Sequence, residues 1–212
     1  MQTKGLKLKI CGMRETENCS EVASLRPDFM GFIFYSRSSR FVDDMPAKLT
    51  GTLRDNGIEP VAVFVNESTD KILEIARAFG FSHIQLHGDE SPEICLKLKS
   101  EGFKVIKAFS IAETRDLDST INYAGTCDLF LFDAKTPDFG GSGKSFDWTL
   151  LNEYTGETSF LLSGGIGPED AERISAFKHP RLAGIDVNSR FESKPGLKDI
   201  TLLQSFIQQL NK

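Results

Sequence analysis

Short apolar runs alternate with helix-like segments along this sequence, and this alternation constrains the fold more than any other feature. Each apolar run is short enough for a strand buried on both faces, and strands that alternate with helices form a parallel sheet covered on both sides. The predicted strands are residues 6–10, 29–34, 61–65, 83–86, 105–109, 129–132, 160–162 and 182–187. The predicted helices are residues 17–25, 46–53, 71–79, 91–99, 113–123, 168–177 and 200–210, and a further helix begins at Asp147.

Two architectures fit this alternation, an open doubly wound sheet and a closed eight-fold barrel. The eight strand–helix pairs favour the barrel, and no Gly-x-Gly-x-x-Gly turn follows the first strand as it would in a dinucleotide-binding sheet. With 212 residues the chain lies near the small end for such a barrel, and no linker rich in proline or serine divides it. The sequence therefore predicts an α/β fold in which residues 1–212 form a single (β/α)₈ TIM barrel domain.

Composition argues against several classes of function. The net charge is −5 and the chain carries no basic stripe, so we expect no binding to nucleic acid. No window approaches the roughly 20 apolar residues of a membrane span, and the first ten residues are too charged for a signal peptide. The four cysteines are scattered without a Cys-x-x-Cys pair, which favours neither a zinc site nor a disulfide framework. We therefore expect a cytoplasmic protein with reduced thiols, no metal and no membrane partner.

Candidate catalytic residues stand where the predicted strands end, which is where barrels carry their chemistry. Cys11 follows the first strand, His87 the fourth and Asp133 the sixth, and Asp186 lies in the eighth. Each also has an ordinary interpretation. A buried cysteine is often an inert core residue, a strand-end aspartate can cap its own turn, and a histidine can simply bind a neighbouring loop.

A glycine-rich turn is the candidate phosphate site. Gly164 and Gly165 lie on the loop after the seventh strand, just before a predicted helix, and Ser189 lies on the loop after the eighth. In barrels these two loops frequently bind phosphate, although a plain tight turn is the alternative. Gly143-Lys144-Ser145 resembles the end of a nucleotide-binding P-loop, but that motif needs glycine at position 138, which is Asp138 here. The sequence therefore argues against a nucleoside triphosphatase.

Seven ordered blocks of residues at strand ends carry a more specific signal. They are Lys9-Ile-Cys-Gly12; Gly31-Phe-Ile-Phe-Tyr35 with Ser39-Arg40; Val63-Phe-Val-Asn66; Gln85-Leu-His-Gly88; Asp133-Ala-Lys-Thr-Pro137 with Gly140-Gly-Ser-Gly-Lys144 and Phe146-Asp-Trp148; Leu162-Ser-Gly-Gly165; and Asp186-Val-Asn-Ser189. A merely shared barrel would not reproduce these blocks together. Over essentially its whole length the chain resembles the phosphoribosylanthranilate isomerase family of tryptophan biosynthesis.

The resemblance implies an Amadori rearrangement that uses no metal and no cofactor. Its substrate is a phosphosugar, N-(5-phosphoribosyl)anthranilate, and its product is 1-(2-carboxyphenylamino)-1-deoxyribulose 5-phosphate. By position, Cys11 resembles the general base and Asp133 the general acid of the family. A free thiol has a pKa of about 8.5, so Cys11 needs surroundings that favour the thiolate. Asp133, in contrast, must hold a proton near neutral pH.

The resemblance also implies binding roles for other residues. Arg40 matches the arginine expected near the anthranilate carboxylate, with Arg37 as a competing candidate. His87 is expected to line the site without transferring protons, and Asp186 to orient the anthranilate amine or the catalytic groups. Gly164, Gly165 and Ser189 are expected at the phosphate. One departure is Arg190, which stands where the family commonly has glycine.

Two other functions compete with this interpretation. A related barrel of histidine biosynthesis runs the same rearrangement on another phosphosugar aminoaldose, but its base on the first strand is a carboxylate, whereas this chain has Cys11. A barrel that binds a phosphosugar without turning it over is the second alternative, and the presence of both Cys11 and Asp133 argues against it. We expect a monomer, with a dimer as the alternative.

Overall fold

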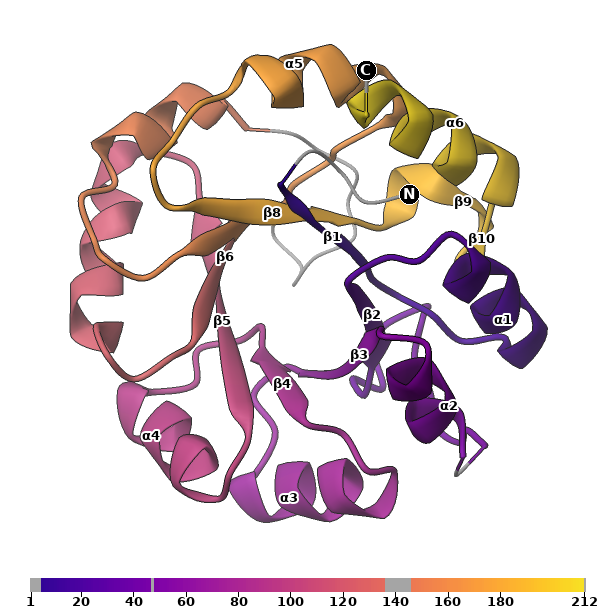
Figure 1. Ribbon diagram of the computed structural model, residues 1–212. Helices are drawn as coiled ribbons and strands as arrows, with labels where there is room; N and C mark the ends of the chain where they lie inside the picture. Colours follow the sequence, from indigo (N-terminus) through magenta and orange to yellow (C-terminus); the bar gives the residue numbers. More distant parts are fainter. Residues whose placement is uncertain (1–4, 47, 136–145, 212) are drawn as a thin grey trace.

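Eight parallel strands close into a barrel in the computed structural model, which describes residues 5–46, 48–135 and 146–211. Figure 1 shows the strands as a ring with the helices outside it. The strands are β1 (Lys7–Ile10), β2 (Phe29–Ile33), β3 (Glu59–Phe64), β4 (His83–Leu86), β5 (Lys104–Ile111), β6 (Leu129–Ala134), β7 (Phe160–Leu162) and β8 (Leu182–Val187). Each strand pairs with the next, and β8 pairs with β1, so the predicted eight-fold barrel is confirmed.

Some parts of the sequence lie outside the described residues. They include residues 136–145, with the Gly143-Lys144-Ser145 segment and the second part of the block that begins at Asp133. The extent of the domain over all of residues 1–212 therefore stays a prediction.

Side chains of each strand alternate between the barrel interior and the layer beneath the helices. Leu8 and Ile10 of β1 point outward into the large hydrophobic core under the helices. Cys11 points inward and packs with a smaller apolar cluster that includes Val63 and Leu161. Lys9 occupies the same inward face as Cys11, so β1 delivers two polar groups to the interior of the barrel.

The helices on the outside are α1 (Thr16–Ser24), α2 (Leu49–Asp55), α3 (Thr69–Ala78), α4 (Pro92–Ser100), α5 (Ala171–Ala176) and α6 (Ile200–Leu210). Two of them begin with side-chain caps, since Ser68 accepts the backbone N–H of Lys71 and Asp199 that of Leu202. None of the helices in the described ranges is both long and apolar enough to cross a membrane.

Three predicted helices differ from expectation. The segments after β5 and β6 are the 3₁₀ helices η1 (Thr114–Tyr123) and η2 (Trp148–Glu153), and the helix predicted over 168–177 divides into η3 (Pro168–Asp170) and α5. In η1 the hydroxyls of Ser119 and Thr120 donate to carbonyls three residues earlier, at 2.7 and 2.6 Å. Such local side-chain bonds compete with the hydrogen bonds of an α-helix.

A small hairpin follows β8 and was absent from the predicted elements. After the 3₁₀ turn η4 (Ser189–Phe191), β9 (Glu192–Lys194) and β10 (Leu197–Lys198) pair antiparallel. Asn18 of α1 fixes the hairpin, because it accepts the backbone N–H of Lys198 at 2.7 Å and donates to its carbonyl at 3.0 Å. In Figure 1 the hairpin lies between α1 and α6. Lys198 of this hairpin reaches back to Asn188, on the loop that follows β8.

Candidate active site

Cys11 lies at the C-terminal end of β1. Its backbone N–H donates to the carbonyl of Val187 at 2.9 Å, which extends the pairing of β1 with β8. Its side chain lies against Gly31 of β2, where the Cβ of any other residue would stand only 2.7 Å from Cys11 Sγ. Glycine at position 31 therefore leaves the space that the thiol occupies.

A buried ion pair lies beside this thiol. Lys9 Nζ contacts Asp186 Oδ1 at 3.0 Å, and the side-chain exposures are 0% and 6%. The register of the two strands explains the contact, since Lys9 and Asp186 are paired directly across β1 and β8. The charge of Lys9 also favours the thiolate form of Cys11 and acts to lower the pKa of that thiol. The sequence predicts Asp186 at the site but assigns no role to Lys9, although its place two residues before Cys11 puts both on one face.

Burial has the largest effect on the ionisation of these groups. It raises the pKa of the Cys11 thiol above its ordinary value, while Lys9 acts to lower that pKa and Asp186 to raise it further. Burial likewise raises the pKa of Asp186, against the attraction of Lys9. For Lys9 burial alone would lower the pKa, but the negative charge of Asp186 and the influence of Cys11 outweigh burial and raise it. The groups that favour the thiolate of Cys11 are thus the cations Lys9 and Lys198, which oppose the effect of burial on its pKa.

Asp133 lies near the end of β6 and is held by His87. Its Oδ2 stands 3.2 Å from His87 Nε2, and its Oδ1 accepts the N–H of Ala134 at 2.9 Å. The second ring nitrogen of His87, Nδ1, lies 2.8 Å from Gln85 Nε2. When the Gln85 amide donates to Nδ1, the ring proton sits on Nε2 and points at Asp133. His87 therefore contacts Asp133 directly, and Gln85 orients the ring of His87. The sequence assigns no role to Gln85.

Arg40 is buried, and its guanidinium forms a bidentate pair with Glu192 of β9. The Nε and Nη2 groups of Arg40 donate to the two carboxylate oxygens at 2.7–3.0 Å. Its side chain also covers Gly12, because a Cβ at Gly12 would lie 2.7 Å from Arg40 Cδ. Arg40 thus lies next to the end of β1, whereas Arg37, the competing candidate, is exposed. The Arg40 guanidinium, which is expected to bind a carboxylate of the substrate, binds the carboxylate of Glu192 in this structure.

Lys198 of β10 completes this second group of charges. Its Nζ donates to Glu192 Oε1 and to Asn188 Oδ1, both at 2.7 Å. Burial lowers the pKa of Lys198, and the attraction of Glu192 opposes that change. Neither Lys198 nor Glu192 is among the residues that the sequence singles out, because both lie on the hairpin that was not predicted.

The predicted phosphate residues lie on two loops that Arg190 joins. Gly164 and Gly165 follow β7 with φ of +88° and +66°, a region that L side chains rarely adopt. Ser189 begins η4 after β8. Arg190 Nη2 pairs with Glu169 Oε1 at 2.7 Å, and Arg190 Nη1 lies 3.5 Å from the carbonyl oxygen of Gly165. The arginine that replaces the usual glycine thus reaches across the turn and pairs with a carboxylate.

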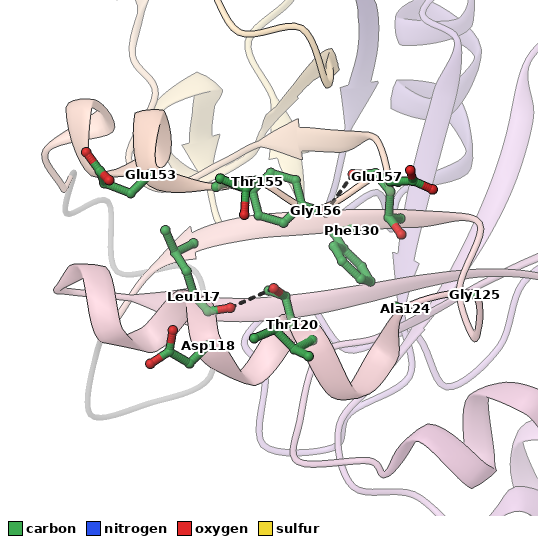
Figure 2. A pocket seen from close by; sticks show the side chains of 13 residues that line it. Leu117, Asp118, Thr120, Ala124, Gly125, Phe130, Glu153, Thr155, Gly156 and Glu157 are labelled. Carbon is green, nitrogen blue, oxygen red and sulfur yellow. Dashed lines mark hydrogen bonds between the residues drawn. The ribbon is translucent and has the colours of Figure 1, made fainter.

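A pocket on the described surface lies beside η1 and η2, away from the C-terminal ends of the strands (Figure 2). It is bounded by η1, η2 and the turns that lead into β6 and β7, including Ala124, Gly125 and Gly156. Cys11 and Asp133 lie at the C-terminal ends of their strands, so this pocket is separate from the candidate site. Within the described residues, no group of three or more His, Cys, Asp or Glu side chains is arranged to hold a metal ion.

Comparison with protein families decides the relationship of the chain. The family model described as N-(5'-phosphoribosyl)anthranilate (PRA) isomerase matches residues 8–209, which is nearly the whole sequence. The chain belongs to this family. The resemblance found at the strand ends is confirmed, and as a PRA isomerase family member the chain is an isomerase.

Individual PRA isomerases agree with this assignment. The N-(5'-phosphoribosyl)anthranilate isomerase of Parabacteroides distasonis is 51% identical over 204 residues, covering 96% of this chain and 92% of the relative. A solved structure of monomers generated from the dimeric isomerase of Thermotoga maritima superposes with a TM-score of 0.78 at 31% identity, covering 97% and 98% of the two chains. A solved PRA isomerase in complex with reduced 1-(o-carboxyphenylamino)-1-deoxyribulose 5-phosphate gives a TM-score of 0.78 at 30% identity, with the same coverage.

Proposed function

We propose that this chain catalyses the Amadori rearrangement of N-(5-phosphoribosyl)anthranilate in tryptophan biosynthesis. The observation that carries the proposal is the placement of Cys11 and Asp133 at the same end of the barrel, on strands that are not neighbours. The reaction needs proton-transfer groups on two sides of a sugar, and such a placement suits it. The printed names of the relatives and the bound product analogue of one of them support the same substrate.

Asp133 is proposed as the general acid that opens the sugar ring. It would donate its proton to the ring oxygen as the bond between C1 and that oxygen breaks, with the bonding electrons passing to oxygen. The nitrogen lone pair then forms the C1=N bond of an iminium ion. The contact of His87 Nε2 with Asp133 Oδ2, at 3.2 Å, would fix the direction of the acid.

Cys11 is proposed as the general base of the second step. Its thiolate would take the proton from C2, the C2–H electrons would form a C1=C2 double bond, and the C=N electrons would return to nitrogen. The resulting enolamine becomes the ketone when C1 gains a proton and the hydroxyl on C2 loses one. The sequence of steps moves protons and bonding electrons without net oxidation, so we propose that it needs neither a metal nor a cofactor.

Arg40 and Asp186 are proposed to bind the anthranilate part of the substrate. Arg40 lies beside Gly12 at the end of β1, and its planar guanidinium can form two hydrogen bonds with a carboxylate. Because the Arg40 guanidinium is bound to Glu192, substrate binding would require it to bind both carboxylates at once or to release Glu192. Asp186 lies within the same interior and could orient the amine, while its other task is to pair with Lys9.

Gly164, Gly165 and Ser189 are proposed to bind the phosphate. The two glycines adopt positive φ at a turn that leads into η3, and Ser189 lies on the next loop. A side chain at Gly165 would meet the phosphate in this arrangement, and its charge would then matter.

A charge introduced at Gly165 should weaken substrate binding. We expect Gly165→Asp to raise KM roughly ten- to a hundredfold relative to Gly165→Asn, because the aspartate would repel the phosphate. This range corresponds to the loss of one hydrogen bond to a charged group, which is worth about 1.5–3 kcal/mol. The two variants share the backbone strain of φ +66° and differ only in charge. Steady-state kinetics measures the difference, and equal KM values would place the phosphate elsewhere.

Turnover is the direct test of the proposed function. We expect the purified chain to consume N-(5-phosphoribosyl)anthranilate and to restore growth without tryptophan to an isomerase-deficient auxotroph. A barrel that only binds phosphosugars would fail both assays. We further propose that the protein acts in the cytoplasm as a monomer; sedimentation of the purified chain distinguishes this from the dimer described for the Thermotoga maritima relative.

A further inference from the structure

Lys9 is a buried cation next to the proposed base, and the proton-transfer steps given above do not use it. Its side chain has no solvent exposure, so the ammonium group cannot turn away into water. A lysine is almost never fully buried unless it is paired, and Asp186 supplies one partner.

The thiol of Cys11 lies near the ammonium group of Lys9. A Cβ at Gly31 would lie 2.7 Å from Cys11 Sγ and 3.2 Å from Lys9 Nζ, so the sulfur and the ammonium share the space that this glycine leaves open. The positive charge of Lys9 acts to lower the pKa of that thiol. The ammonium group therefore pairs with the carboxylate of Asp186 and also lies near the thiol of Cys11.

Other charged groups face Cys11 as well. Asp186 of β8 and Lys198 of β10 both act on its ionisation, the first against the thiolate and the second in its favour. Arg40, after β2, covers the neighbouring Gly12. Lys198 and Arg40 both pair with Glu192, whereas Lys9 Nζ borders the same space beside Gly31 as the thiol. Lys9 also exerts the strongest opposition to the effect of burial on Cys11.

We propose that Lys9 is a positioning residue that stabilises the thiolate of Cys11 and so prepares it to abstract the substrate proton. In the ionisation step the S–H bond breaks, its electron pair stays on sulfur, and the proton leaves to solvent. The proposal rests on the proposed role of Cys11 as the base, but it concerns a state of the free protein. It can therefore be tested without turnover.

Alkylation of Cys11 by iodoacetamide measures the thiolate. The sulfur anion forms an S–C bond as the C–I bond breaks and iodide leaves, and mass spectrometry of peptides identifies the modified cysteine. An opposite charge at 4–6 Å shifts a pKa by about 1–3 units, so Lys9→Met should slow alkylation at pH 7.5 roughly 10- to 1000-fold and move its pH profile upward. Asp186→Asn should have the opposite effect, because Asp186 opposes the thiolate.

Lys107→Met is the matched control. Lys107 of β5 is also a buried lysine, paired with Glu90 at 3.3 Å, but it lies beneath the helices and beside the ring of Tyr123 rather than at Cys11. Its loss should leave the alkylation of Cys11 unchanged. A loosened barrel would expose Cys11 and speed its alkylation, so slower alkylation in Lys9→Met cannot come from partial unfolding.

A second comparison covers the case in which Lys9→Met does not fold because Asp186 is left unpaired. The double variant Lys9→Met/Asp186→Leu buries neither charge, and its Cys11 should react at least tenfold more slowly than that of Asp186→Asn, which keeps Lys9. Equal alkylation rates in these pairs would overturn the role of Lys9. Slower alkylation together with full turnover in Cys11→Ala would instead overturn Cys11 as the base and leave the electrostatic effect of Lys9 standing.

Discussion

Replacement of Asp133 by asparagine should lower kcat by about 10² to 10⁴, the usual contribution of general acid catalysis. Asparagine keeps the shape of the side chain and an oxygen that can accept the N–H of Ala134, but it has no acidic proton to give to the ring oxygen. The fold should therefore survive while ring opening fails. Turnover assays and circular dichroism of the purified variant measure the two properties.

The matched control for this variant is Asp89→Asn. Asp89 is an exposed carboxylate on the loop that follows His87, so the same chemical change is made close to the site but not in it. We expect its kcat to equal that of the unmodified protein. Near-normal turnover by Asp133→Asn would remove Asp133 from the mechanism.

Replacement of Cys11 by alanine should cause a loss of similar size, about 10² to 10⁴ in kcat, because the proton on C2 would have no base. Cys19→Ala is its control, since Cys19 is a buried thiol in α1 and its loss removes a similar volume from the core. A substrate carrying deuterium at C2 provides the second measurement. If Cys11 acts only at C2, its loss should make the isotope effect on kcat larger, whereas the loss of Asp133 should not.

Equal kcat values for Cys11→Ala and Cys19→Ala would contradict the role of Cys11. A large loss without a rise in the isotope effect would show instead that Cys11 supports binding or ring opening. The two predictions together assign the acid and the base to separate steps, which neither substitution could do alone.

The strands could be predicted closely from sequence because a strand buried on both faces leaves a strong apolar signal. Phe160–Leu162 and Leu182–Val187 have the predicted bounds, and β5 is longer than predicted, at Lys104–Ile111. The helical segments over residues 114–123 and 148–153 were predicted in place, but not as 3₁₀ helices. Their hydrogen-bond pattern depends on local side-chain hydrogen bonds and on packing against aromatic residues such as Phe109 of β5. The spacing of apolar residues in the sequence reveals neither of these.

The candidate site was predictable to the extent that its residues stand at strand ends. Cys11 and Asp133 could be identified in this way, and so could His87. Lys9 could not, because a charged residue within a short strand is ordinarily an exposed one, and its burial depends on the closure of β1 onto β8. Glu192 and Lys198 were missed for a different reason: the hairpin that carries them owes its position to Asn18 of α1, a contact across 180 residues of sequence.

The pairing of β1 with β8 makes the site a product of the complete fold. Lys9 and Asp186 are 177 residues apart in sequence, yet each is the neighbour that makes burial of the other tolerable. When only β1 to β7 have been synthesised, Cys11 and Lys9 are present, but Asp186, whose carboxylate pairs with Lys9 in the barrel interior, is still missing. Contacts of such long range form late and slowly. During synthesis the thiol should therefore acquire its charged surroundings at the last step of barrel closure.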